Sequence, residues 1–156
     1  MSDPIIAGAR AVLDEALDEL RAVIVSLDAD TLNRLPLPDD TNSLAVLVVH
    51  ALASTRSWLS LATGADLPPR ERDAEFRTVV VDPALFLAEV DQVAAACRAL
   101  LDPGIAFDPE RRGVAPWVTG ELADQPVTAA WALLHALTHI HEHVGHAQLT
   151  RQLWKV

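Results

Sequence analysis

Apolar positions recur at helical spacing in four segments of the chain, separated by polar and turn-forming stretches. In the first segment they follow one another at steps of three and four residues, with acidic residues on the opposite side. Its apolar stripe is Leu13, Leu17, Leu20, Ile24 and Leu27. The turn signals in LPLPDD end this segment. A second apolar segment runs from about Ser43 to Leu61 and is ended by TGADLPP. Both segments are predicted to be helices.

The third segment opens with Asp82 as a helix cap and Pro83 in the first turn, which is the preferred arrangement there. Its buried stripe is predicted to be Phe86, Val90, Val93, Cys97 and Leu100. A fourth helix is predicted from near Pro126 to about Leu153. The only strand candidate is RTVVVD, which cannot build a sheet alone. Four long amphipathic helices without a sheet predict an all-α fold, a four-helix bundle in one domain over residues 1–156.

Two connections are longer than a simple bundle requires: ADLPPRERDAEFRTVVV (65–81) and DPGIAFDPERRGVAPWVTGELADQ (102–125). Long loops of this kind are often binding loops or lids, and they can equally be crossover connections. Their arginines either bind a carboxylate substrate or an acidic cofactor, or simply make the loops soluble. These arginines are Arg70, Arg72, Arg77, Arg111 and Arg112.

Composition and charge exclude several classes of partner. The net charge of −10 argues against nucleic acid and against an anionic membrane surface, since both require clustered Lys and Arg. The acidic N-terminus does not resemble a secretory signal, and LAVLVVHALA is too short to span a bilayer. The single cysteine, Cys97, excludes an internal disulfide and is typical of the reducing cytoplasm. We therefore expect a cytoplasmic protein acting on a small molecule.

Five of the six histidines lie within twelve residues, in HALTHIHEHVGH (135–146). Each helical residue advances about 100°, so with His135 at zero, His139 lies at about 40°, His143 at about 80° and His146 at about 20°. His141 points to another face. Histidines exposed to solvent would have no reason to align in this way. The i, i+4 pair of His139 and His143 has the spacing that lets two imidazoles reach one metal ion.

The sixth histidine, His50, shares a stripe of the second helix with Leu47, Trp58 and Leu61, and should point into the bundle. A buried histidine is costly unless its nitrogens have partners. Opposite His139 and His143 it would complete a three-histidine site with an open position, the pattern of a catalytic metal. The alternative is that these histidines are hydrogen-bonded core residues.

Several neighbouring residues have two interpretations. Glu142 is either a general base or support for a ligand, or an ordinary solvated carboxylate. His135 and His146 either support the metal ligands by hydrogen bonds or are hydrogen-bonded core residues. Trp58 and Trp131 either wall a metal pocket or belong to the core. The match of residues 139–143 to the inverted protease motif HxxEH is interpreted as coincidental, because too little chain follows for the third ligand.

These features resemble the DinB/YfiT-like superfamily of metal-binding four-helix bundles over nearly the whole chain. The specific likeness is the inward histidine in NSLAVLVVHALAS and the last helix LLHALTHIHEHVGHAQLTRQLW. There, H-x-x-x-H followed by glycine two residues on corresponds to His139, His143 and Gly145. The resemblance implies that His50, His139 and His143 are the ligands. The mycothiol-dependent branch, which includes maleylpyruvate isomerase, is similar around His135 and His146 but usually has a glutamate where this sequence has His139.

The resemblance also implies a divalent metal, zinc or nickel most often, and a low-molecular-weight thiol such as mycothiol or bacillithiol. The activity would be an S-transfer or isomerisation in which the metal binds the thiol as a thiolate. No side-chain nucleophile is then required, and Cys97 is expected to be a core residue. Two alternatives stay open. One is a non-catalytic bundle that binds a metal or a small ligand, and the other is a structural bundle that forms a homodimer.

Overall fold

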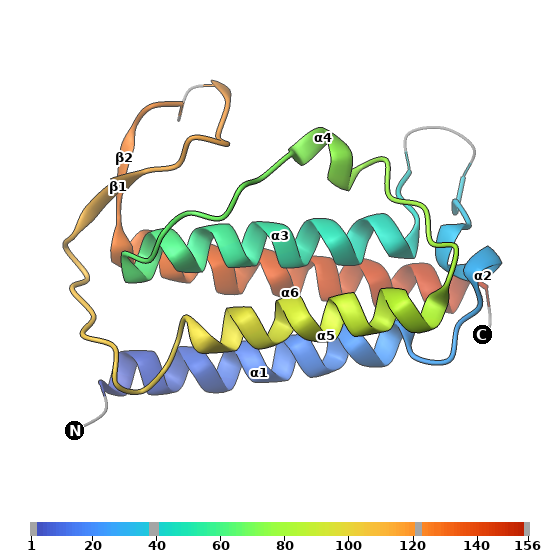
Figure 1. The fold of residues 1–156 in the computed structure, drawn as a ribbon, viewed down its shortest axis with the longest axis horizontal. Helices are drawn as coiled ribbons and strands as arrows, with labels where there is room; N and C mark the ends of the chain where they lie inside the picture. The colour runs from blue at the N-terminus through green and yellow to red at the C-terminus, as the bar shows by residue number, and fades with distance from the viewer. Residues whose placement is uncertain (1–2, 38–40, 121–122, 155–156) are drawn as a thin grey trace.

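Four long helices pack side by side in a bundle, which confirms the all-α fold predicted from the sequence (Figure 1). The structure is a computed structural model that describes residues 3–37, 41–120 and 123–154. The bundle helices are α1 (Pro4–Ile24), α3 (Leu44–Thr63), α5 (Pro83–Ala99) and α6 (Ala129–Leu153). Two short helices, α2 (Ala29–Asn33) and α4 (Arg72–Glu75), and a small hairpin of β1 (Arg112–Val114) and β2 (Pro126–Thr128) lie in the connections.

Each bundle helix begins at a side chain that caps its free backbone N–H groups. The carboxylates of Asp3 and Asp82 each accept two of these bonds, and a proline follows each of them in the first turn. Ser43 caps α3 and Thr128 caps α6 in the same way. Helix α3 ends at Gly64, whose φ of 76° lies in the left-handed region that glycine adopts readily.

Helix α3 is the core helix of the bundle. It packs along α6 on one side and against α5 on the other (Figure 1). By length and composition it could cross a membrane, but 83% of its apolar window is buried inside the protein. Its apolar character therefore reflects burial by neighbouring helices, as expected for a helix that is hydrophobic on nearly all sides.

The fourth bundle helix begins at Ala129 rather than near Pro126. Residues Pro126–Thr128 pair instead with Arg112–Val114 in an antiparallel ladder, with Gly113 opposite Val127. This hairpin was not predicted, because three-residue strands carry no readable alternation. Leu27, predicted in the stripe of the first helix, lies beyond its end at Ile24 and packs partly buried against the core.

The predicted strand candidate RTVVVD is not a strand in the part of the chain that the structure describes. Its central residue Val80 is held by the side chain of Asn33, which bonds both backbone groups of Val80 at 2.7 and 2.8 Å. A side-chain amide thus replaces a neighbouring strand, and the segment stays extended without forming a sheet.

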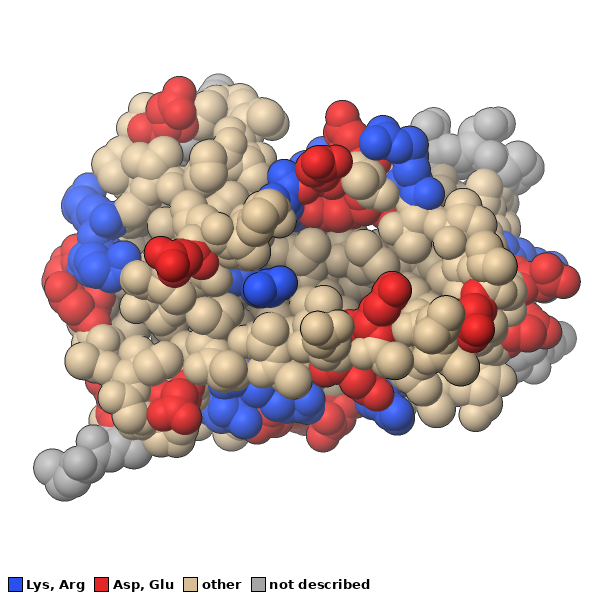
Figure 2. All heavy atoms as spheres, viewed as in Figure 1, with Lys and Arg blue, Asp and Glu red and all other residues tan. Residues whose placement is uncertain are grey.

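The two long connections fold over the bundle. Residues 65–81 run along α3 and carry α4, and residues 102–125 rise at one end and return through the hairpin (Figure 1). Arg111 anchors the second connection by donating to the carbonyl oxygen of Leu61 near the end of α3. On the face seen in Figure 2, basic side chains are interspersed with acidic ones and form no continuous basic surface.

Candidate metal centre

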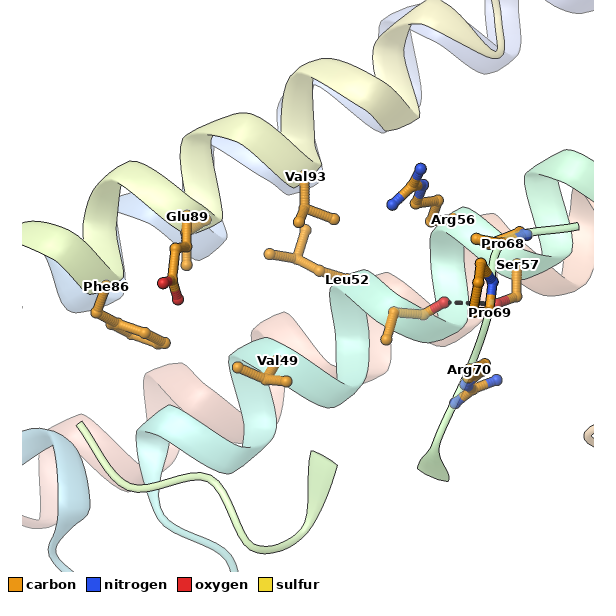
Figure 3. Close-up of a pocket in the computed structure, with 12 residues that line it drawn as sticks. Val49, Leu52, Arg56, Ser57, Pro68, Pro69, Arg70, Phe86, Glu89 and Val93 are labelled. Atoms are coloured by element: carbon orange, nitrogen blue, oxygen red, sulfur yellow. Dashed lines mark hydrogen bonds between the residues drawn. The ribbon is translucent and has the colours of Figure 1, made fainter. Parts of the chain in front are cut away.

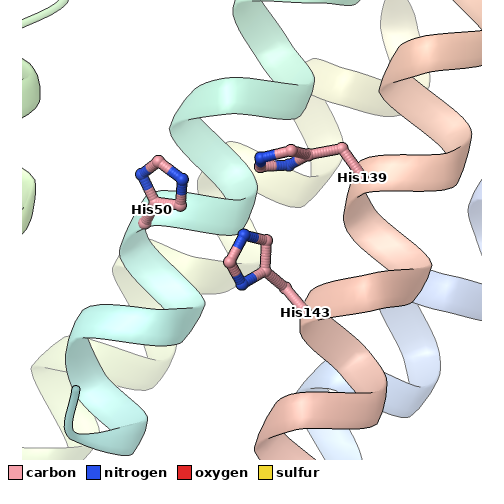
Figure 4. A group of neighbouring side chains, drawn as sticks. All are labelled: His50, His139 and His143. Atoms are coloured by element: carbon pink, nitrogen blue, oxygen red, sulfur yellow. The ribbon is translucent and has the colours of Figure 1, made fainter. Parts of the chain in front are cut away.

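Three histidines from two helices converge between α3 and α6. His50 comes from α3, and His139 and His143 project from successive turns of α6 toward it (Figure 4). One ring nitrogen of each residue lies within 4.8 Å of the others, close enough for one metal ion to be shared. The helical spacing on α6 and the inward direction of His50 together bring about this arrangement.

A buried carboxylate holds His50 from the side away from the cluster. Glu75, in α4, accepts a hydrogen bond from Nδ1 of His50 at 2.7 Å. The guanidinium of Arg70 donates to both carboxylate oxygens of Glu75, at 2.7 and 3.1 Å. The side chains of Arg70 and Glu75 are only 6% and 5% exposed, so this ion pair is shielded from water.

The contacts of Glu75 fix the tautomer of His50. Burial alone would raise the pKa of the Glu75 carboxyl, but the bonds from Arg70 and His50 outweigh it and lower the pKa below its ordinary value. An ionised carboxylate only accepts hydrogen bonds, so Nδ1 of His50 carries the proton. The other nitrogen, Nε2, keeps a free lone pair. A carboxylate that orients a histidine in this way is the usual support of a metal-bound imidazole.

The two histidines of α6 are half-buried, neutral imidazoles whose Nδ1 atoms are buried. Burial, reinforced by the neighbouring histidines, lowers the pKa of His139 to about 3 and that of His143 to about 4. Both therefore have free lone pairs at neutral pH. Nδ1 of each is buried without a hydrogen-bond partner among the described residues. Such orphaned nitrogens are costly in a core and fit a site that accepts a metal ion.

The sequence model of the mycothiol-S-transferase family matches residues 9–155. The chain belongs to this family, whose members have the DinB-like fold. A search among the curated proteins finds no match. A crystal structure of a conserved protein from Enterococcus faecalis has a TM-score of 0.73 and 18% sequence identity, covering 97% of this chain and 98% of that one. At that identity the likeness concerns the fold alone.

Within this mycothiol-S-transferase family member, His135 and His146 flank the three-histidine cluster. His135 is half-buried and makes no hydrogen bond to another described residue. Its ring instead stacks on Trp131 at 4.7 Å and meets the face of Trp58 at 4.7 Å. His146 is exposed, with its ring 5.7 Å from that of His143. One of the two interpretations predicted that these residues donate or accept a hydrogen bond that supports a metal ligand. The structure shows no such bond to His139 or His143; His135 and His146 lie against these two residues through their rings.

Glu142 is exposed and makes no hydrogen bond or ion pair among the described residues. No hydrogen bond or ion pair joins its carboxylate to His139 or His143, although Glu142 is three residues from one and adjacent to the other. The predicted general base therefore contacts none of the three histidines. The carboxylate that bonds a histidine of the cluster is Glu75, from a different part of the chain.

Glu75 carries no signal in the sequence that distinguishes it from its neighbours. It stands in the charged run RERDAEFR, where any of three acidic residues could be solvated. Only the path of the long connection across α3 places this one beside His50. Of the loop arginines, Arg70 is bound to Glu75, and Arg72 lies 4.9 Å over the ring of Phe76, which itself contacts His50.

Cys97 is expected to be unreactive in the folded protein. It is fully buried in the core, and burial raises the pKa of its thiol to about 12. Iodoacetamide at pH 8 should leave the native protein unmodified for hours and alkylate the urea-unfolded protein completely, as read by mass spectrometry. Rapid alkylation of the native protein would mean that Cys97 is accessible and able to act as a nucleophile.

The metal-free protein is expected to lose stability as the pH falls from 7 to 5. His139 and His143 have folded-state pKa values of about 3 and about 4, against about 6.5 in an unfolded chain. Between these values the unfolded state binds protons that the folded state does not. The free energy of unfolding therefore keeps its full value above about pH 6.5 and decreases as the pH falls below it. After allowance for partial exposure, we expect a loss on the order of 2 kcal/mol at pH 5.

Urea unfolding at several pH values, with a chelator present, measures this effect. The pKa of Glu75 is lowered, so its contribution is lost only below about pH 4.5, outside the window. Replacing both His139 and His143 by alanine should reduce the dependence between pH 7 and 5, whereas His141→Ala should not. Part of the dependence should remain, because burial also lowers the pKa of His50 and of His135. A stability that stays constant down to pH 5 would show that the two imidazoles are not held neutral.

Proposed function

We propose that the protein is a metal-dependent S-transferase that joins a low-molecular-weight thiol, mycothiol or a close analogue, to an electrophilic small molecule. The observation that carries the proposal is the cluster of His50, His139 and His143, neutral and within 4.8 Å of one another, in a member of the mycothiol-S-transferase family. A divalent ion such as zinc or nickel, when bound there, lowers the pKa of a bound thiol and supplies a thiolate at neutral pH.

The chain's own residues have separate parts in this proposal. His50, His139 and His143 would hold the ion, and three protein ligands leave a position for the thiol. Glu75 keeps the proton of His50 on Nδ1, so that the lone pair of Nε2 is available to an ion. In the transfer, the thiol sulfur bonds to the electrophilic carbon and the leaving group departs from that carbon, while the thiol proton is released to solvent.

The burial of Cys97 supports an external thiol. The only cysteine of the chain is in the core on α5, away from the histidine cluster, so the protein offers no thiol of its own for the reaction. A sulfur nucleophile must therefore come from a bound small molecule.

The test is a thiol-transfer assay with mycothiol and monobromobimane, which becomes fluorescent when sulfur displaces its bromide. We expect the zinc- or nickel-loaded protein to accelerate the reaction, and the chelated protein and His143→Ala to return to the background rate. His141→Ala, whose Nδ1 is bonded to Leu137, serves as the matched control and should retain activity. A protein that binds one metal ion but leaves the rate of a panel of thiols and electrophiles unchanged would favour the non-catalytic binding bundle.

A further inference from the structure

A pocket lies between α3 and α5, apart from the histidine cluster. It has a volume of about 210 Å³ and is closed on one side by residues 68–70 of the first long connection (Figure 3). None of the three histidines lines it. The nearest link to the metal centre is Arg70, which lines the pocket with its stem and directs its guanidinium to Glu75.

The interior of this pocket is apolar because apolar side chains from both helices line it. Helix α3 contributes Val49, Leu52 and Ala53 to its wall. Helix α5 contributes Phe86, Val90 and Val93. All six side chains are buried or half-buried, so the hollow is recessed between the two helices. Transfer of an apolar group from water into it would be favourable.

The part of the wall formed by Ser57, Pro68 and Pro69 offers no free hydrogen-bond donor. Pro68 and Pro69 have no backbone N–H, and the hydroxyl of Ser57 is already bonded to the carbonyl oxygen of Ala53 at 2.9 Å. A ligand in the interior therefore gains from apolar contact and shape. Polar recognition is confined to the ends of the pocket.

The two ends carry opposite charges. Arg56 stands at the end near Pro68, and Glu89 stands at the other end beside Phe86 (Figure 3). Arg56 is exposed and forms no ion pair within the part of the chain that the structure describes, although Arg10, Arg21, Arg70 and Arg98 all do. Since Arg70 is engaged by Glu75, Arg56 is the guanidinium that remains available to a ligand in this pocket.

We propose that this pocket binds a small apolar monocarboxylate of about ten heavy atoms, because its volume is smaller than that of the pockets that enclose drug-sized ligands. The ring or branched chain of the ligand lies between α3 and α5, and its carboxylate meets Arg56, which suits the fork of the guanidinium. Glu89 disfavours a second anionic group at the far end. The site is separate from the proposed transfer reaction, because none of the three histidines lines the pocket.

The test is calorimetric or NMR titration of the full chain with 3-phenylpropionate, beside the neutral 3-phenylpropionamide. We expect the carboxylate to bind about fivefold more tightly than the amide, the gain of roughly 1 kcal/mol typical of one partly exposed ion pair. The affinity should be the same with and without a chelator. Binding that disappears with the chelator would place the carboxylate on the metal and overturn the proposal, as would no binding at millimolar concentration.

Substitutions of residues that line the pocket test whether the probes bind there. Arg56→Gln should make the carboxylate and the amide bind equally, whereas Arg77→Gln, an exposed arginine outside the pocket, should leave the fivefold preference intact. Ala53→Leu, and independently Val93→Phe from the opposite wall, should fill the hollow and weaken both probes at least tenfold. Each filled variant should keep the metal content of the unmodified protein. Unchanged binding in a folded filled variant would contradict the site.

Discussion

Replacing His143 by alanine is expected to lower the affinity for zinc or nickel by about 100-fold or more. Binding free energies of multi-ligand zinc sites are about 10–16 kcal/mol, so loss of one ligand costs roughly 3 kcal/mol. His143 contributes one of three nitrogens that lie within 4.8 Å of one another, and no other described residue stands ready to replace it. The measurement is a competition titration against a chromophoric chelator at pH 7.

The metal-free form of this variant should be at least as stable as the unmodified protein. Alanine removes an imidazole whose buried Nδ1 has no hydrogen-bond partner among the described residues. Loss of affinity without loss of stability separates a ligand from a core residue. His141→Ala on the same helix is the control and should bind the metal normally. An unchanged affinity in His143→Ala, or an equal loss in the control, would contradict the three-histidine assignment.

Replacing Glu75 by alanine is expected to have the largest effect on stability, a loss of about 3 kcal/mol or more. The substitution leaves the guanidinium of Arg70, 6% exposed, without its carboxylate partner. It also frees His50 to change its tautomer and orientation. Metal affinity should fall a further 10- to 100-fold, as for other residues that orient a metal-bound histidine. Urea unfolding with a chelator, and metal titration of the same samples, measure the two effects.

Removing Arg70 as well should recover part of this loss. The double variant Arg70→Ala/Glu75→Ala has no unpaired buried charge, so it should be more stable than Glu75→Ala alone. It should still bind metal weakly, since His50 stays unsupported. Asp73→Asn, an exposed carboxylate in the same short helix, is the control and should change neither quantity. A double variant less stable than Glu75→Ala would show that the cost does not come from an unpaired Arg70.

The bundle and the grouping of the three histidines were predictable because both depend on local, periodic patterns. Caps such as Ser43 and Asp82 mark the starts of their helices, and helical spacing alone puts His139 and His143 on one stripe. The direction of His50 followed from its apolar neighbours on α3. These signals concern residues within one or two helical turns of each other.

The support of the site was not predictable, because it depends on where a long connection runs. Glu75 reaches His50 across 25 residues of sequence, and Glu142, adjacent in sequence to His143, is exposed to solvent. The side chain of Asn33 bonds the backbone of Val80, 47 residues away, and occupies the groups that a neighbouring strand would bond. Contacts of this kind are set by tertiary packing, which overrides local preference.

The measurement that tests the central claim most directly is the metal content of tag-free protein by mass spectrometry, beside its melting temperature with and without a chelator. The account predicts about one zinc or nickel ion per chain and a clear drop in melting temperature on chelation, since a ligand that binds only the folded state stabilises it. Protein without metal, whose melting temperature stays the same with chelator and after addition of zinc or nickel, would contradict a metal centre at His50, His139 and His143.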